Sequence, residues 1–306
     1  MKKSFSVVTT VFNDSEGIIE LLIELCGQTL IPNEIIIADG GSSDDTCQLI
    51  KEFAARSEVP VVLIEGQKLN IPQGFNTAIR KATYDTVGIV ATGNHYPSNY
   101  FEVLVDRVAE PEIEGAYFPV VSKEINKFTV AYGKAFLARG LRIPSNHGIV
   151  MRKSVFDRYG YFYENFIYAG EDGEFYPRIP KDKLLCVPDG YVEWEVPENI
   201  IYFKKQIRYY TIAQEQIYGF PKAIINFIVW KTIVQYFAAV AFFFCFLVVE
   251  NYWIKSIFCI LEIMAILHIF KKGVLVARLK FVQEFYKIAY MFRDRKYFSK
   301  QYRVER

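Results

Sequence analysis

Three carboxylates lie within four residues of one another in the stretch 168–179, which reads YAGEDGEFYPRI. They are Glu171, Asp172 and Glu174, and Arg178 follows them. Clustered like charges destabilise a folded chain unless they have a partner or a function. Paired carboxylates with an arginine suit a site that keeps one base ionised while it holds a polar substrate. The alternative is a solvated acidic turn, and the flanking sequence has to decide between the two.

The elements that would position these carboxylates follow from an alternation of short apolar runs and helical repeats. Ser42 and Asp45 have the spacing of a capping box for the second helix. Strands that alternate with helices predict an α/β fold with a parallel, doubly wound sheet. The predicted strands are residues 5–8, 34–38, 59–64, 86–91 and 118–121, and the predicted helices are residues 15–27, 45–53 and 73–82.

Polar residues follow the predicted strands directly. In a parallel sheet, ligands bind beyond the carboxyl ends of the strands. In this chain those ends are followed by residues 10–13, 39–42, 65–67 and 92–95. Because all four sets fall on one edge of the sheet, we expect the binding site at that edge.

Four segments of the chain resemble family 2 glycosyltransferases of the GT-A fold. They read SVVTTVFND, QTLIPNEIIIADGGSSDDT, RKSVFDRYGYFYEN and GEDGEFYPRI, in the family's order along residues 4–210. The chain is similar in particular to membrane-associated enzymes of bacterial exopolysaccharide (succinoglycan-type) synthesis. The resemblance implies a GT-A, Rossmann-like domain that binds a nucleotide-sugar donor, usually a UDP-sugar. It also implies an inverting transfer of one sugar to a lipid-linked or growing glycan acceptor in cell-surface polysaccharide synthesis.

By this resemblance, Asp172 is the general base that takes the proton of the acceptor hydroxyl as its oxygen attacks the anomeric carbon. Glu171 would orient Asp172 or bind a hydroxyl of the donor. Arg178 is expected to anchor the loop by an ion pair rather than to touch substrate. The segment 146–152 resembles the family's strand before the acceptor site, so His147 is expected on the acceptor side.

On the donor side, Asp39 matches the family aspartate that accepts a hydrogen bond from the nucleotide base. A carboxylate at a strand end beside a helix N-terminus is a good acceptor, although Asp39 could instead begin a tight turn at Gly40. The resemblance places Thr10 and Asn13 along the base and the ribose. It places Asn76 on a helix beside the nucleotide, where the residue could equally be an exposed helical one.

The chain departs from the family after the fourth strand. The family has an aspartate-x-aspartate motif there, whose carboxylates hold Mg²⁺ or Mn²⁺. This chain has Thr92, Gly93 and Asn94 instead, followed by His95. Thr92, Gly93 and Asn94 are expected beside the donor, and Asn94 and His95 remain the candidate metal ligands. Three interpretations stay open: a metal held mainly by the diphosphate, cationic side chains in place of a metal, or a domain without catalysis.

Arg208 and Tyr209 match part of the Gln-x-x-Arg-Trp motif of processive family members, since this chain reads Lys205-x-x-Arg208-Tyr209. Arg208 could reach the donor diphosphate, and Tyr209 could stack on an acceptor sugar as tryptophan would. A processive polysaccharide synthase subunit is therefore one alternative function. Another is a catalytically silent GT-A domain that binds nucleotide-sugar or glycan as a scaffold in a synthase complex.

The last third of the chain is apolar and then basic. Two apolar runs, residues 233–249 and 253–270, are candidate transmembrane helices, and interfacial helices are the alternative. Residues 271–306 hold eleven Lys or Arg against three Asp or Glu, which favours anionic lipid over nucleic acid as a partner. We therefore expect a GT-A domain at residues 1–222, a membrane hairpin at 223–272 and a basic amphipathic tail at 273–306.

The remaining composition favours the cytoplasmic side of an inner membrane. The five cysteines are widely spaced and form no C-x-x-C pattern, which suggests a reducing compartment. The first residues lack the apolar core and the cleavage site of a signal peptide. We expect the catalytic domain to face the cytoplasm. Its expected partners are the donor, a lipid-linked glycan, membrane lipid and other polysaccharide-assembly proteins.

Overall fold

The computed structural model describes residues 3–138, 140–218 and 274–294. The chain forms two compact units. The first comprises Met1–Gly133 and Leu137–Glu198, and the second comprises Lys134–Phe136 and Asn199–Arg306. Every strand of the described residues belongs to the first unit.

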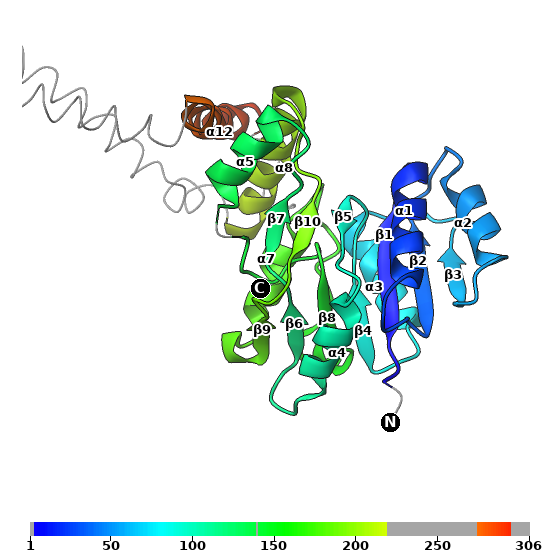
Figure 1. Ribbon diagram of the computed structural model, residues 1–306. Helices are drawn as coiled ribbons and strands as arrows, with labels where there is room; N and C mark the ends of the chain where they lie inside the picture. The colour runs from blue at the N-terminus through cyan, green and yellow to red at the C-terminus, as the bar shows by residue number, and fades with distance from the viewer. Residues whose placement is uncertain (1–2, 139, 219–273, 295–306) are drawn as a thin grey trace, which may run out of the picture. The chain divides into compact units, whose positions relative to one another are not determined.

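The main sheet of the first unit has seven strands, namely β1 (Ser6–Val11), β2 (Glu34–Asp39), β3 (Val61–Ile64), β4 (Thr86–Ile89), β6 (Gly115–Tyr117), β8 (Ile149–Arg152) and β9 (Leu184–Cys186). Their order is β3-β2-β1-β4-β8-β6-β9 (Figure 1). Strands β1 to β4 are parallel, which confirms the predicted α/β fold.

Strand β8 differs from the prediction of a fully parallel sheet, because it is antiparallel to both β4 and β6. The chain leaves the sheet at the carboxyl end of β4 and enters β8 at the same edge, since Ile89 pairs with Ile149. The residues just before β8 therefore lie at the edge that holds the carboxyl ends of β1, β2 and β4. This places Asn146 and His147 at the predicted binding edge.

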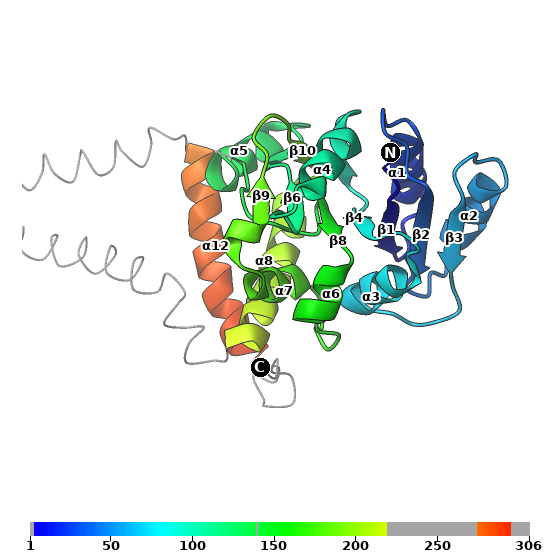
Figure 2. The same ribbon diagram turned by 90° about the horizontal axis from the view of Figure 1, so that it is seen from below.

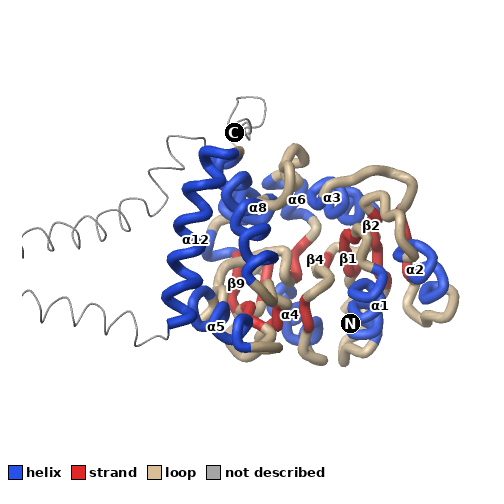
Figure 3. The backbone as a smooth tube through the Cα atoms, turned by 90° about the horizontal axis from the view of Figure 1, so that it is seen from above, coloured by secondary structure: helices blue, strands red, loops and turns tan. Residues whose placement is uncertain are grey.

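Helices cover both faces of the sheet (Figures 2 and 3). One face carries α1 (Ser15–Cys26), α2 (Thr46–Ala54) and α4 (Tyr100–Ala109). The other face carries α3 (Ile71–Lys81), α6 (Ser154–Tyr159) and α7 (Glu171–Phe175). Neighbouring strand residues alternate between the two hydrophobic clusters, since Val7 and Ile35 belong to the first cluster whereas Val8 and Ile36 belong to the second. This two-sided burial explains why the strands read as continuous apolar runs.

The chain enters a second sheet directly after β4. This sheet has three short strands, β5 (Asn94–His95), β7 (Val120–Ser122) and β10 (Val192–Trp194). Its order is β5-β10-β7, and β5 is antiparallel to β10 with Asn94 opposite Trp194. The segment after β4 is therefore held in a regular ladder. The remaining short elements of the first unit are η1 (Tyr176–Arg178) and η2 (Lys181–Lys183).

Helix caps differ from the sequence-based expectation at one position. Ser42 does not open a capping box, because its hydroxyl accepts a hydrogen bond from the backbone N–H of Asn13. Helix α2 begins after Asp45, whose side chain makes no capping bond. Capping boxes occur instead before α3, at Asn70, and before α5 (Lys127–Phe136), at Asn126. These polar N-caps satisfy the first backbone N–H groups of the two helices.

The described part of the second unit contains the helices α8 (Ile200–Tyr218) and α12 (Val274–Arg293), which pack against each other. The Arg208 guanidinium forms two hydrogen bonds with the Asp294 carboxylate, Nε to Oδ2 and Nη2 to Oδ1, each 2.8 Å long. Among the described residues, no helix combines the length and the apolar character that a membrane crossing requires. The predicted membrane hairpin at residues 223–272 lies outside the described residues.

Candidate active site

The donor side of the candidate site lies at the carboxyl ends of β1 and β2. The Asp39 carboxylate, the last residue of β2, accepts hydrogen bonds from the backbone N–H of Gly41 at 2.9 Å and of Ser42 at 3.0 Å. Gly41 has a φ of 92°, a conformation that favours glycine. Asp39 therefore stabilises the tight turn after β2, which was the alternative role considered for this residue. Its carboxylate is bonded to the backbone of that turn.

Thr10 and Asn13 lie on the neighbouring strand end and contact the same turn. The Thr10 hydroxyl donates to the carbonyl of Ala38 at 2.9 Å. The Asn13 side chain accepts a hydrogen bond from the backbone N–H of Ser43 at 2.8 Å. Asn13 has a φ of 48°, which asparagine tolerates better than most residues. Thr10, Asn13 and Asp39 are thus brought together, as the sequence predicted.

Asn76 is placed differently from the prediction. It lies on α3 but has no exposed surface. Its Nδ2 donates to the carbonyl of Phe162 at 2.8 Å and to the Glu164 carboxylate at 2.9 Å, and its Oδ1 accepts from the backbone N–H of Phe162 at 3.0 Å. Asn76 therefore ties α3 to the loop after α6, and its amide does not line the donor side.

Asn94 closes the turn after β4 with its own side chain. Its Nδ2 donates to the carbonyls of Ala91 at 3.1 Å and Thr92 at 3.2 Å. Gly93 has a φ of 71°, and its carbonyl accepts a hydrogen bond from the backbone N–H of Glu195 at 2.8 Å. Only 4% of Asn94 is exposed. The amide therefore points into the turn rather than out toward a bound donor.

The amide oxygen of Asn94 determines which ring nitrogen of His147 carries the proton. Because Nδ2 of Asn94 donates to two carbonyls, its Oδ1 accepts, and the partner at 2.9 Å is Nδ1 of His147. His147 therefore carries its proton on Nδ1. Desolvation lowers the pKa of His147 to about 4, so the imidazole is neutral at pH 7 with Nε2 as its acceptor nitrogen. The ring lies 4.4 Å from that of Trp194, centroid to centroid.

His95 belongs to a separate polar cluster. Its Nδ1 lies 2.7 Å from a Glu24 oxygen, and its Nε2 lies 3.0 Å from a Glu195 oxygen and 2.7 Å from Lys123 Nζ. Desolvation acts to lower the pKa of His95, but the hydrogen bonds with Glu195 and Glu24 raise it overall. Both ring nitrogens are thus engaged by side chains of this chain.

The two predicted metal ligands, Asn94 and His95, therefore do not fit a protein-held metal. The amide oxygen of Asn94 accepts from His147, and the nitrogens of His95 face carboxylates and a lysine. Within the residues that the structure describes, no three His, Cys, Asp or Glu side chains are grouped so that they could hold a metal ion. The prediction that these two residues bind Mg²⁺ or Mn²⁺ is not supported by their geometry.

The acceptor side consists of Glu171 and Asp172 at the start of α7. Only 6% of Glu171 is exposed, and its Oε1 accepts a hydrogen bond from Nδ2 of Asn146 at 3.0 Å. Its other oxygen, Oε2, is buried without a hydrogen-bond partner. The Asp172 carboxylate accepts a hydrogen bond from the backbone N–H of Gly173 at 2.6 Å. Gly170, before the pair, has a φ of 124°, a backbone conformation that favours glycine.

Burial perturbs both carboxyl groups. Desolvation, followed by the charge of Asp172, raises the pKa of Glu171 to about 7. Desolvation also raises the pKa of Asp172 above its ordinary value, against the backbone hydrogen bonds that lower it. Two carboxyl groups in this arrangement do not both ionise readily in weakly acidic solution. Perturbed, partly buried carboxyl pairs at a binding edge are typical of catalytic acids and bases.

Arg178 anchors this loop, as predicted. Its Nε donates to Glu174 Oε1 at 3.0 Å, and its Nη2 contacts Glu174 Oε2. Its Nη1 donates to the carbonyls of Tyr159 at 3.1 Å and Tyr161 at 2.9 Å. The third carboxylate of the cluster, Glu174, is thus neutralised by its own arginine. The acidic cluster therefore has two parts. Glu174 forms a structural ion pair with Arg178, whereas Glu171 and Asp172 form the carboxyl pair of the candidate site.

Two adjacent residues before β8 connect the turn after β4 with the carboxyl pair. His147 binds Asn94, and Asn146, the residue before it, binds Glu171. Sequence analysis did not single out Asn146. The available signal was its position, because it is a polar residue just before a strand that begins at the binding edge.

The family model for glycosyl transferase family 2 matches residues 6–169, more than half of the chain. The chain belongs to this family. This confirms the resemblance on which the donor and acceptor assignments depend, and the enzyme class of the family is glycosyltransferase.

Two curated proteins from bacteria are similar to parts of this family 2 chain. The glycosyltransferase GlyG of Streptococcus pneumoniae serotype 4 is 25% identical over 146 residues, which cover 47% of this chain and 48% of that protein. The undecaprenyl-phosphate 4-deoxy-4-formamido-L-arabinose transferase of Pectobacterium carotovorum is 35% identical over 85 residues, 25% of this chain and 26% of that protein. The matches thus span about half, or less, of the relatives' own lengths.

A solved structure supports the fold. The mannosyltransferase PcManGT from Pyrobaculum calidifontis, in complex with GDP-Man and Mn²⁺, superposes with a TM-score of 0.65 at 17% identity. The match covers 95% of this chain and 86% of that one. At this identity the likeness shows a shared glycosyltransferase fold.

Two further predicted residues, Arg208 and Tyr209, lie on α8 in the second unit. The Arg208 guanidinium is engaged by Asp294, and the ammonium of Lys205 lies 5.7 Å from the centre of the Tyr209 ring. The predicted contacts of Arg208 with the donor and of Tyr209 with an acceptor sugar stay predictions.

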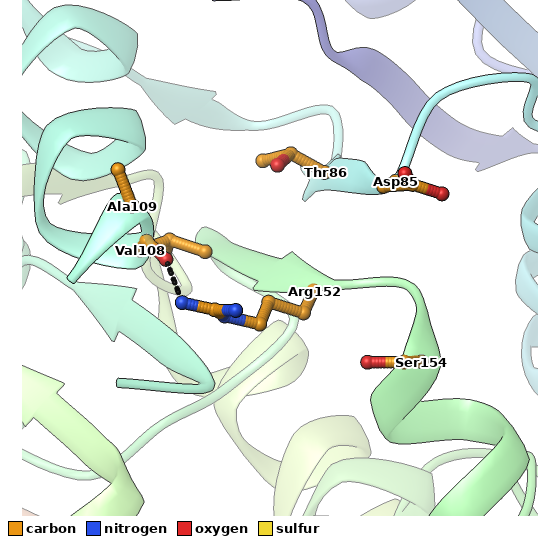
Figure 4. Close-up of a pocket in the computed structure, with 6 residues that line it drawn as sticks. All are labelled: Asp85, Thr86, Val108, Ala109, Arg152 and Ser154. Carbon is orange, nitrogen blue, oxygen red and sulfur yellow. Dashed lines mark hydrogen bonds between the residues drawn. The ribbon is translucent and has the colours of Figure 1, made fainter. Parts of the chain in front are cut away.

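A pocket of about 460 Å³ lies at the other edge of the sheet (Figure 4). Thr86 at the start of β4 pairs with Arg152 at the end of β8, so this pocket is on the edge opposite the candidate site. The Arg152 guanidinium is occupied by the backbone carbonyls of Ile113 at 3.0 Å and Val108 at 2.9 Å. The pocket is lined by Asp85, Thr86, Val108, Ala109, Arg152 and Ser154. We give this pocket no part in the candidate active site.

Proposed function

We propose that this family 2 chain is an inverting glycosyltransferase that moves a sugar from a nucleotide-sugar donor to a lipid-linked or growing glycan acceptor. The observation that carries the proposal is the pair of buried Glu171 and half-buried Asp172 at the carboxyl edge of the sheet that Asp39 also occupies. A lipid-linked acceptor is supported by the name of the Pectobacterium relative, which acts on undecaprenyl phosphate. The predicted UDP-sugar donor and a role in cell-surface polysaccharide synthesis belong to the same proposal.

Asp172 would act as the general base. It would take the proton of the acceptor hydroxyl as the hydroxyl oxygen forms a bond to the anomeric carbon and the nucleoside diphosphate leaves with the bonding electrons. A pKa raised by burial makes Asp172 a stronger base than an exposed aspartate. Much of the rate would come from positioning the acceptor beside Asp172. The geometry of Asn94 and His95 gives no reason to route a step through a protein-held metal.

Transfer can be tested with the purified full chain in detergent, with UDP-glucose, UDP-galactose, UDP-N-acetylglucosamine and GDP-mannose as donors and an undecaprenyl-diphosphate-linked sugar, which offers free hydroxyl groups, as acceptor. Release of nucleoside diphosphate should depend on the acceptor, and Asp172→Asn should lower kcat by about a hundredfold or more. Asp182→Asn, a change at an exposed carboxylate, is the matched control. A wild type that transfers nothing from any donor, with or without Mn²⁺, would count against the proposed activity.

The second candidate function is a silent domain that binds nucleotide-sugar or glycan as a scaffold. It is favoured by one observation, the inward orientation of Asn94 where the family has a metal-binding aspartate. Calorimetry with the same donors separates the two candidates, because a scaffold binds a donor without turnover. Processive synthesis, the remaining alternative, would show as a ladder of product lengths.

We also propose that α12 lies on an anionic membrane surface at the cytoplasmic face, which would hold the catalytic unit near a lipid-linked acceptor. Phe281, Phe285 and Ile288 are exposed along one face of this helix, and the rings of Phe281 and Phe285 stack at 6.3 Å. Arg278 and Lys280 are exposed beside them. An exposed apolar stripe with basic neighbours is the pattern of a helix that binds the interface of an anionic bilayer.

Co-sedimentation with vesicles tests this part of the proposal. The full chain should bind phosphatidylglycerol vesicles more tightly than phosphatidylcholine vesicles, and salt should weaken the binding. The double variant Phe281→Ser, Phe285→Ser should bind less tightly. Ile23→Ser, which changes an exposed apolar residue of α1, is the matched control. Equal binding of all three proteins to both kinds of vesicle would exclude a role for this face of α12.

A further inference from the structure

Asn146 contacts both members of the carboxyl pair. Its Nδ2 donates to Glu171 Oε1 at 3.0 Å, and its backbone amide acts to lower the pKa of Asp172. Its Oδ1 accepts from the Tyr176 hydroxyl at 2.7 Å. Only 7% of Asn146 is exposed. An amide with both ends bonded in a buried site is held in one orientation, because rotation would turn its oxygen toward the Glu171 carboxylate oxygen.

The arrangement gives the two carboxyl groups unequal surroundings. The Asn146 side chain binds Glu171, whereas the hydrogen bond that the Asp172 carboxylate accepts among the described residues comes from the backbone N–H of Gly173. The charge of Asp172 raises the pKa of Glu171, and the charges of both carboxyls raise the pKa of the Tyr176 hydroxyl. The side-chain amide of Asn146 binds Glu171 and therefore distinguishes it from Asp172.

We propose that Asn146 is a positioning residue for the base. Its side-chain amide binds the Glu171 carboxyl group and holds it in place. Asp172 is then the carboxylate that takes the proton of the acceptor. This inference rests on the proposed function, in which Asp172 is the general base. It concerns a residue that does not itself touch the reacting atoms in that mechanism.

Asn146→Asp is the sharpest test, because aspartate has the same shape and still accepts from Tyr176, yet it cannot donate to Glu171. A third carboxyl at this position should raise the apparent pKa values of the pair by about one unit or more, since like charges disfavour ionisation. The acid limb of the kcat/KM profile should move to higher pH by the same amount. At pH 7, kcat should fall by about tenfold or more while the KM for the donor changes little.

Asn70→Asp is the matched control. Asn70 also donates through Nδ2 to buried backbone carbonyls, those of Glu164 and Phe166, but it touches neither carboxyl of the pair. This variant should lose stability without moving the pH profile. If Asn146→Asp does not fold, Tyr176→Phe decides the question, because it removes only the hydroxyl that orients the Asn146 amide. A shift of the acid limb in the same direction but smaller is then expected.

A measurement without turnover separates this inference from the proposed function. The infrared band of protonated carboxyl groups can be titrated in the ligand-free full chain, with Glu171→Gln to identify the contribution of Glu171. Titration of the pair at a higher pH in the folded Asn146→Asp or Tyr176→Phe variant supports the inference. An unshifted titration in a folded variant overturns it. A wild type that is inert with every donor refutes the proposed function, and the infrared result still decides whether Asn146 controls the pair.

Discussion

Replacing Asn94 by aspartate would restore a carboxylate where the family carries one, and the structure predicts that the chain tolerates it poorly. Nδ2 of Asn94 donates to the carbonyls of Ala91 at 3.1 Å and Thr92 at 3.2 Å. In Asn94→Asp, a carboxylate oxygen would face these two carbonyl oxygens. The bond from His147 would remain, because the other oxygen still accepts.

The loss can be sized from those contacts. Two buried hydrogen bonds contribute about 0.5–1.5 kcal/mol each, and repulsion between the oxygens adds to their loss, so we expect about 2–3 kcal/mol of destabilisation at pH 7. For a unit of this size the melting temperature should fall by about 4–12 °C. The folded-state pKa of the new carboxyl would lie above its unfolded value of about 3.9. The deficit should therefore be small near pH 4 and grow as the pH rises through the folded-state pKa.

Urea denaturation at several pH values measures this, with Asn126→Asp as the matched control. The Oδ1 of Asn126 accepts from the backbone N–H groups of Phe128 at 2.8 Å and Thr129 at 3.0 Å, so a carboxylate fits there and stability should change by less than about 0.5 kcal/mol. Mn²⁺ should stabilise Asn94→Asp no more than wild type. The reasoning fails if Asn94→Asp is as stable as wild type at pH 7, or if Mn²⁺ stabilises it selectively, because the side chain would then face outward.

Two further changes test the carboxyl cluster. Glu171 has its pKa raised to about 7, so the stability that its neutral form provides is complete below about pH 4.5 and is lost as the pH rises through 7. Glu171→Gln should thus gain about 1–3 kcal/mol over wild type between pH 5 and pH 8, and a pH-independent difference in urea denaturation would contradict this. Arg178→Ala leaves the buried Glu174 carboxylate unpaired and should cost about 3–5 kcal/mol, whereas Arg80→Ala, at an exposed pair with Glu164, should cost less than about 1 kcal/mol. Equal losses by thermal denaturation would show that Glu174 does not depend on Arg178.

The sequence was sufficient for the features that local patterns determine. Apolar runs that end in polar residues predicted β1, β2 and β4, and the polar residues after them do meet at one edge. Arg178 was expected to anchor its loop by an ion pair, and the structure identifies Glu174, four residues before it, as the partner. These predictions needed no information about distant parts of the chain.

The orientation of Asn94 could not be predicted in this way. Its amide is fixed by His147, which lies 53 residues further along the chain, and by the antiparallel entry of β8. The capping box at Ser42 failed for a similar reason, since the hydroxyl accepts a hydrogen bond from the backbone N–H of Asn13, which lies in the loop after β1. In both cases a tertiary partner competes with the local pattern for a polar group, and composition does not reveal which one wins.

The same long-range contacts show what Asn94 does at a position where the family has a metal-binding aspartate. An aspartate at position 94 would present a charge, whereas Asn94 uses its amide to close the turn and to hold a proton on Nδ1 of His147. The adjacent residue, Asn146, uses its own amide to distinguish Glu171 from Asp172. Two neutral amides thus organise the centre of the site through fixed hydrogen bonds. In the proposed mechanism, the hydrogen bonds of these amides would orient the base and its neighbour as preorganised dipoles.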